Sequence, residues 1–324
     1  MGLLDLARRL LRVPAEATTG LREPAARPDR AAQHPWDPQR AAHAQPPAAP
    51  QAAPADPQPP NLPAACLFFS YATGRACGTG QALNPAERAV LEELERLLQE
   101  PQRLSSWIPR PPAVLPRLLA CLREDDSSLR EACAVLQEDP YLATEVLRLA
   151  NSARHQHGNP VTDLKRAAVR LGFDGLRRAI SSSLVRPLFD VRREPMLAQA
   201  LPRLWTHAQS KSGWCHAIAP VRGVDAFDAY LAGLTHNIGW IGALKAVGRA
   251  SIGSTPEYSG EFVLALTRRS ERMFACSAEQ WAVNDALSRL GATLRACSLE
   301  DAGDALAQVL YQADARATAE LAAA

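Results

Sequence analysis

The chain has 324 residues, and its 36 lysine and arginine residues nearly balance its 34 aspartate and glutamate residues, leaving a formal net charge of +2. This small charge gives no overall attraction to nucleic acid or to an anionic membrane. The seven cysteines form no C-x-x-C pair, which argues against a disulfide framework or a zinc ribbon and favours buried free thiols. Because the sequence has neither an apolar run of 18 residues nor the apolar core of a signal peptide, we expect a cytoplasmic protein without a transmembrane span.

A short amphipathic helix is predicted at residues 1–13, where Leu3, Leu6, Leu10 and Val13 recur on one helical stripe. Such a helix could dock on a partner protein or make weak contact with a membrane surface. Fraying in solution, or packing on its own domain, is an equally good alternative for so short a segment.

Residues 14–65 are predicted to be a disordered linker. Half of the 26 prolines lie between Pro14 and Pro63, in a stretch of alanine, proline, glutamine and arginine with almost no aliphatic residues. Such a composition cannot bury enough apolar surface to offset the entropy lost on ordering the chain.

A connecting segment and a helix are predicted at residues 66–103. The segment begins with CLFFSY, which is strand-like, and three glycines follow it. The glycines fit no phosphate-binding motif, so an ordinary turn is favoured over a nucleotide site. Asn84, Pro85 and Glu87 then provide the N-cap, the first-turn proline and the capping box of a helix.

From residue 104 onward one helix signal follows another, with no convincing alternating strand, so the predicted fold class is all-α. A helical domain is predicted at residues 104–313, followed by a C-terminal tail at 314–324. The later helices are expected roughly at 197–219, 226–247, 261–274, 278–296 and 301–313.

Three stretches taken together resemble the HDOD family. They are IPRPPAVLPRLL at 108–119, EDPYLATEVLRLANSA at 138–153, and LWTH at 204–207 with AYLAGLTHNIG at 229–239. The second is the most specific, because it combines a helix N-cap, a first-turn proline, an apolar stripe and a polar turn at fixed offsets. The resemblance implies an HD-like helical bundle and a bacterial signalling or regulatory module with no established catalytic activity.

The resemblance also locates a degenerate metal site. HD-type phosphohydrolases hold a divalent cation with a first histidine, a His-Asp pair and a distal aspartate. Here His207 and His236 occupy the histidine positions, but Asn237 stands where the carboxylate belongs, and a neutral amide cannot offset the charge of the ion. Asp285 lies in the general region of the distal acid. We therefore expect no catalytic residue, bound metal or cofactor, with His207 as a core histidine and His236 and Asn237 in a residual polar network.

An arginine-rich region at residues 148–193 supports a separate hypothesis. Arg166, Arg170, Arg177 and Arg178 recur near helical spacing and could bind phosphate in a nucleotide messenger or a nucleic acid. Because the single aromatic residue among them, Phe173, makes no stacking platform and no recognition motif accompanies them, a solvated face is favoured.

The leading interpretation is a non-catalytic signal-transduction or regulatory module that acts by binding a protein partner or a ligand. The alternatives are a metal-dependent HD-type phosphohydrolase, such as a phosphodiesterase, and an anion or nucleic-acid binder that uses the arginine-rich region.

Overall fold

A computed structural model describes residues 63–78, 82–109, 163–190, 194–250 and 256–323, together with the single positions 144, 146, 147, 151 and 161. The elements, in chain order, are α3 (Ala64–Thr73), β1 (Ala76–Gly78), α4 (Pro85–Gln99), α5 (Pro101–Leu104), α9 (Leu164–Val185), η1 (Arg186–Phe189), α10 (Pro195–Ile218), η2 (Ala219–Arg222), α11 (Ala226–His236), α12 (Ile238–Arg249), β2 (Glu257–Ser259), α13 (Gly260–Trp281), α14 (Asp285–Ala296) and α15 (Ala305–Ala323).

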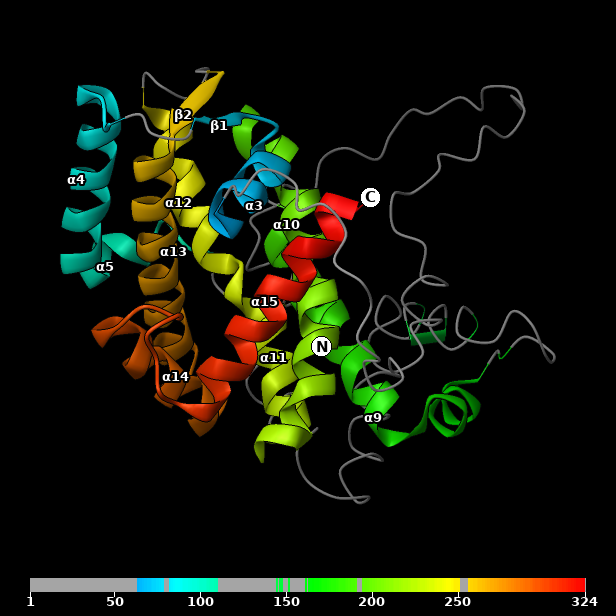
Figure 1. Ribbon diagram of the computed structural model, residues 1–324. Helices are drawn as coiled ribbons and strands as arrows, with labels where there is room; N and C mark the ends of the chain where they lie inside the picture. Colours follow the sequence, from blue (N-terminus) through cyan, green and yellow to red (C-terminus); the bar gives the residue numbers. More distant parts are fainter. Residues whose placement is uncertain are drawn as a thin grey trace, which may run out of the picture.

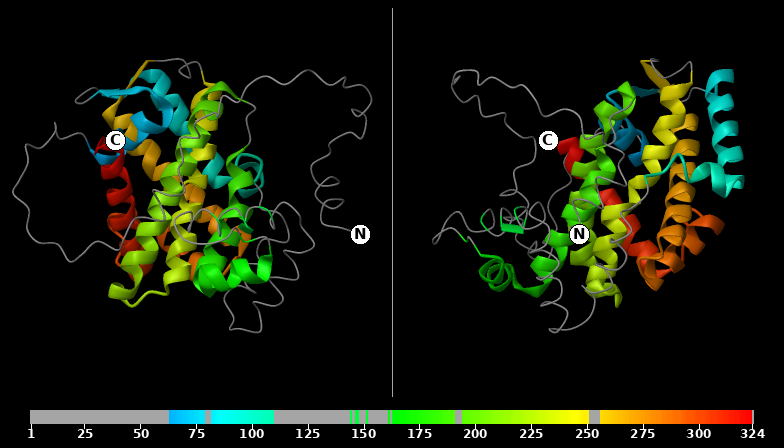
Figure 2. Two further views of the ribbon diagram at one scale, coloured as in Figure 1. Left: turned by 90° about the vertical axis from the view of Figure 1, so that its right-hand side faces the viewer. Right: turned by 180° about the vertical axis from the view of Figure 1, so that it is seen from behind.

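The fold is all-α, as predicted, and α10 lies at its centre. This helix packs against α3, α11, α12 and α15, while α13 packs against α4, α12 and α14. Figure 1 shows α15 running beside α10, with α4 on the far side of α13. The two further views in Figure 2 show the same arrangement, with α9 at the edge of the bundle. Buried apolar side chains from these helices form one continuous core. None of the described helices is long and apolar enough to cross a membrane.

The segment that looks strand-like in the sequence is a helix, so this expectation was wrong. CLFFSY lies in α3, whose Cys66, Phe68, Phe69 and Ala72 are buried at helical spacing. The run of apolar residues is satisfied equally well by a buried helix, and tertiary packing decides between the two. Gly74 ends α3 in the left-handed conformation, with φ of 68°. The strand that follows is β1, which pairs in parallel with β2.

Two cysteines in this region are paired, although free thiols were expected. Cys66 of α3 and Cys77 of β1 form a disulfide. Cys215 and Cys276 are free and buried, as the sequence suggested. The pairing could not be read from sequence spacing, because it depends on α3 turning back at Gly74 toward β1.

The capping box of α4 is confirmed. The Asn84 side chain accepts a hydrogen bond from the backbone N–H of Glu87, and the Glu87 carboxylate accepts one from the backbone N–H of Asn84. Glu87 also accepts hydrogen bonds from the backbone N–H and the hydroxyl of Ser259, each 2.8 Å long. Since Ser259 is the N-cap of α13, this buried carboxylate joins the starts of two helices.

Several helix boundaries differ from those expected. The helix expected at 226–247 is two helices, α11 and α12, which meet at Asn237. The helix expected at 301–313 begins at Ala305 and continues to Ala323, so most of the expected tail at 314–324 is helical. The alanine-rich sequence of that tail has no helix breaker, and its buried residues Ala317 and Thr318 pack on the bundle.

Close helix packing explains the glycine at position 239. A Cβ atom added there would collide with the backbone of Ser270 and Phe274 in α13. Gly239 thus allows α12 and α13 to approach backbone to backbone.

Several sequence predictions fall on residues outside those the structure describes. These are the helix at 1–13, nearly all of the linker at 14–65, and most of the motifs at 108–119 and 138–153. Asn151, which belongs to the second motif, is described. Its side-chain amide donates to the carbonyl of Val161 at 2.9 Å and accepts from the N–H of Val161 at 2.7 Å.

Candidate functional site

A buried lysine lies at the centre of the candidate site. The ammonium Nζ of Lys211 is 2.9 Å from Nδ1 of His236, 2.6 Å from Oδ1 of Asn237 and 2.8 Å from Oδ1 of Asp314. An ammonium group has three N–H donors, and each of these acceptors takes one of them. We call Lys211, His236, Asn237, Asp314 and His207 the lysine-centred cluster.

His207 completes the cluster through Asn237. The amide Nδ2 of Asn237 donates to the backbone carbonyl of Leu204 at 2.9 Å and lies 3.2 Å from Nδ1 of His207. Nε2 of His207 is 3.1 Å from the hydroxyl of Thr318. Because the amide donates to Nδ1, the proton of the neutral His207 ring lies on Nε2 and is directed at Thr318. Both ends of the Asn237 amide are thus hydrogen-bonded: its oxygen accepts from Lys211, and its nitrogen donates to His207 and to the backbone carbonyl of Leu204.

Three helical segments bring these residues together. His207 and Lys211 are one turn apart on α10, and so share a face of that helix. His236 and Asn237 lie at the junction of α11 and α12. Asp314 and Thr318 are one turn apart on α15 and face α10. The cluster therefore depends on the contact between α10 and α15 that Figure 1 shows.

The cluster is almost completely shielded from water. Lys211, His207 and Asn237 are fully buried, and His236 is 5% exposed. The ring of Phe68 covers His207 at a centroid distance of 4.4 Å, and Phe274 packs edge-on against His236. Only the side chain of Asp314 retains substantial exposure, at 34%.

Burial and the ammonium charge set the protonation of the cluster. Burial, reinforced by the charge of Lys211, lowers the pKa of His207 to about 3. The same two causes hold the pKa of His236 well below its ordinary value. Burial opposes ionisation of Asp314, but the ammonium of Lys211 outweighs it and holds the pKa of this carboxyl well below its usual range. At neutral pH the cluster therefore contains two neutral imidazoles, a neutral amide, one ammonium and one carboxylate.

The structure brings together the three residues that the sequence singled out, His207, His236 and Asn237. Asp285 is not with them, because it is exposed at the start of α14. The carboxylate of the cluster is Asp314, which sequence reasoning had placed in a tail. Lys211 was also missed, although one signal was available: it is one of only three lysines in the chain and lies four residues after His207.

The cluster does not fit the divalent metal ion that an HD-type domain would hold. A metal ion needs lone pairs directed at an empty position, and here the position is taken by an ammonium group. The acceptors offer one carboxylate, whereas a divalent ion in this kind of site is offset by more negative charge. Among the residues that the structure describes, no three histidine, cysteine, aspartate or glutamate side chains are grouped so as to hold a metal ion.

The predicted arginine face is interrupted. Arg166 and Arg170 precede Gly172, whose φ of 69° and ψ of 172° break α9, whereas Arg177 and Arg178 follow it. The guanidinium of Arg177 stacks on the ring of Phe227 at 4.1 Å. The four arginines therefore do not lie along one straight helix, and Arg177 contributes to packing.

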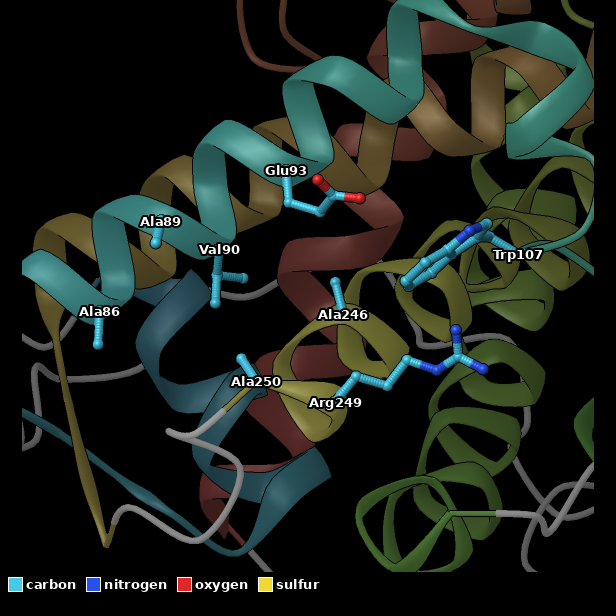
Figure 3. Close-up of a pocket in the computed structure, with 8 residues that line it drawn as sticks. All are labelled: Ala86, Ala89, Val90, Glu93, Trp107, Ala246, Arg249 and Ala250. Carbon is cyan, nitrogen blue, oxygen red and sulfur yellow. The ribbon is translucent and has the colours of Figure 1, made fainter.

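A separate pocket of about 320 Å³ lies between α4 and α12, and Figure 3 shows the side chains that surround it. The indole of Trp107 forms one wall, and the guanidinium of Arg249 lies 5.0 Å from its ring. Arg249 is paired with Glu194, and Glu93 with Arg96. The pocket shares no residue with the lysine-centred cluster; it is lined by Ala86, Ala89, Val90, Glu93, Trp107, Ala246, Arg249 and Ala250.

The fold is an all-helical domain in which a lysine, two histidines, an asparagine and an aspartate form one buried cluster. The family model of the HDOD domain matches residues 108–293, which is more than half of the chain. The chain therefore belongs to the HDOD domain family.

The chain is also similar to individual known proteins. An uncharacterized protein from Treponema pallidum (strain Nichols) is 28% identical over 138 residues, which are 41% of this chain and 25% of that protein. The chain thus spans about a quarter of the length of this relative. Among solved structures, an HDOD domain protein with unknown function from Geobacter sulfurreducens has a TM-score of 0.51 at 21% identity, over 68% of this chain and 77% of that one.

A second solved structure, from Shewanella amazonensis SB2B, is described as a "Putative metal-dependent phosphohydrolase". It has a TM-score of 0.51 at 18% identity, over 71% of this chain and 82% of that one. At this level of identity the likeness establishes the fold and leaves the activity of this chain to be argued from its own residues.

Proposed function

We propose that the chain is a non-catalytic regulatory module of a cytoplasmic signalling pathway that acts by binding a protein partner or ligand. The observation that carries this proposal is the position of the Lys211 ammonium, 2.6–2.9 Å from Asn237, Asp314 and His236. A phosphohydrolase of the HD type needs a metal ion there, to bind a phosphate oxygen and activate water. A lysine in that place removes the group on which the chemistry depends.

The alternative is a metal-dependent HD-type phosphohydrolase, which the description of the Shewanella amazonensis structure favours. For this alternative to hold, Lys211 would have to leave the cluster and the ion would have to bind with Asp314 as its carboxylate ligand. Leaving the site would place a buried ammonium among apolar side chains, at a cost of several kcal/mol. The first proposal requires no such rearrangement.

The deciding experiment measures metal content and turnover of the full chain. We expect less than one equivalent of manganese, iron or zinc after purification. We also expect no hydrolysis of cyclic dinucleotides or nucleotide monophosphates above the level of His236→Ala. His216→Ala is a matched control, because His216 lies on α10 outside the cluster and contacts Asp174. Metal-dependent turnover that His236→Ala abolishes and His216→Ala preserves would establish the hydrolase.

A further inference from the structure

We infer that Lys211 is the resident cation of this site: the chain supplies its own ammonium group in place of a metal ion. The surrounding acceptors would then form a divalent-cation site again once the lysine is removed and one carboxylate is restored. This inference deepens the proposed function, because it names what blocks the metal.

The first argument is geometric. The three acceptors come from the α11–α12 junction and from α15, yet all converge on one point at 2.6–2.9 Å. Convergence of nitrogen and oxygen lone pairs from separate elements on a single buried point is what a cation site requires. A salt bridge with Asp314 alone would leave two N–H donors of the buried ammonium without acceptors. The contacts of His236 and Asn237 make the arrangement a coordination shell.

The second argument is charge. With Lys211 charged, Asp314 charged and both histidines neutral, the formal charges of +1 and −1 cancel. Replacing Lys211 by alanine leaves −1, and the additional change Asn237→Asp leaves −2. The double variant then offers two carboxylates and a histidine nitrogen around an empty position. This donor set is suited to Mn²⁺ or Zn²⁺ and has a charge that matches a divalent ion.

The third argument is access. Lys211 and Asn237 are fully buried, whereas the Asp314 side chain is 34% exposed. The Asp314 side chain therefore lies on the solvent side of the cluster, and its carboxylate would be the first ligand that an ion meets.

The test compares five chains: the unmodified protein, Lys211→Ala, Asn237→Asp, the double variant Lys211→Ala/Asn237→Asp, and the control Lys245→Ala/Asn237→Asp. The control also loses one lysine and gains one carboxylate, but keeps Lys211; Lys245 contacts Ser106 and lies outside the cluster. Each full chain is stripped of metal and titrated with Mn²⁺ or Zn²⁺ alone. Isothermal titration calorimetry measures stoichiometry, and the melting temperature is followed in parallel.

We expect the double variant to bind one equivalent of ion and to gain thermal stability with increasing ion concentration, because binding to the folded state alone stabilises it. Its affinity should exceed that of Lys211→Ala at least tenfold and should be lost on adding His236→Ala. The unmodified protein, Asn237→Asp and the control should bind no stoichiometric ion, since the ammonium still occupies the position.

Stoichiometric binding by Asn237→Asp or by the control would overturn the inference, because Lys211 would then not be what excludes the ion. A folded double variant that binds neither ion would also overturn it. If the double variant does not fold without metal, its refolding yield with and without Mn²⁺ or Zn²⁺ decides. A refolding yield that recovers when the ion is added supports the inference. If the ion does not restore folding of the double variant although Lys211→Met folds, the inference is contradicted. Turnover by the unmodified protein without added metal would refute only the proposed function.

Discussion

Nζ of Lys211 lies 2.8 Å from Oδ1 of Asp314 and so joins the central helix α10 to the last helix α15, across 103 positions of sequence. The lysine is fully buried while the aspartate is one-third exposed. A pair of this kind holds two helices in register, and its loss leaves an uncompensated charge inside the protein.

Replacing Lys211 with methionine should destabilise the protein by about 3 kcal/mol, because the buried acceptors of His236 and Asn237 and the Asp314 carboxylate lose their common donor. Methionine nearly preserves the volume, so the effect reports the lost charge and hydrogen bonds. Urea denaturation followed by circular dichroism measures it. The matched control, Lys245→Met, should change the free energy of unfolding by less than about 1 kcal/mol. Equal effects of the two changes would contradict a special role for Lys211.

Truncation after Ala313 should be far more damaging than loss of a tail. It removes Asp314 and Thr318, and with them the bonds from α15 to Lys211 and His207. It also removes Glu320, which accepts from Trp214 at 2.9 Å. We expect a melting temperature lower by about 10 °C or more, or an insoluble protein, from the loss of several buried interactions. Truncation after Thr318, which keeps the cluster, should be markedly milder in the same thermal scan. If both truncations behave alike, the cluster does not hold α15.

The protein should lose stability as pH falls below about 6.5, because His207 and His236 are neutral in the folded state. Their folded pKa values are lowered, so the unfolded chain binds more protons in this range. Their contribution is fully present above pH 6.5 and is lost progressively down to the folded pKa of His207, about 3. Each histidine contributes a slope of about 1.4 kcal/mol per pH unit. Urea denaturation at pH 6.5, 5.5 and 4.5 measures how the free energy of unfolding changes with pH. His207→Gln should reduce this slope by the contribution of one histidine. An unchanged slope would mean that His207 is protonated in the folded state.

Glu271 should have the opposite pH dependence. Burial raises the pKa of this carboxyl from 4.5 to about 7, although it accepts hydrogen bonds from Leu299 and Arg268. The folded state therefore binds the proton more tightly than the unfolded chain. The stabilisation is fully present below pH 4.5 and is lost as pH rises to about 7.

Glu271→Gln should remove this loss. The free energy of unfolding of the variant, compared with that of the parent, should therefore be about 1–3 kcal/mol more favourable at pH 8 than at pH 5. Glutamine keeps an oxygen that can accept from Leu299. Glu279→Gln on the same helix, at an ion pair with Arg295, is the control for the loss of one carboxylate. A Glu271→Gln protein that is less stable than the parent at both pH values would show that the ionised carboxylate is required.

The sequence by itself determined the elements whose causes are local. The capping box of Asn84 and Glu87 requires only a helix start within four residues, and it forms as predicted. The all-α class follows from helical periodicity over long stretches. His207, His236 and Asn237 were singled out by the resemblance of LWTH and AYLAGLTHNIG to the HDOD family.

Tertiary structure alone decided what lies between those residues. The acceptors of Lys211 belong to two other segments, 25 to 103 positions away from it along the chain, and no local pattern relates them. Asp314 appeared to be in a tail because its alanine-rich surroundings lack a strong amphipathic pattern. CLFFSY appeared to be a strand because a short apolar run satisfies either conformation. In each case the deciding free energy comes from burial against distant helices, which makes a lysine the centre of a site that the sequence presented as two histidines and an asparagine.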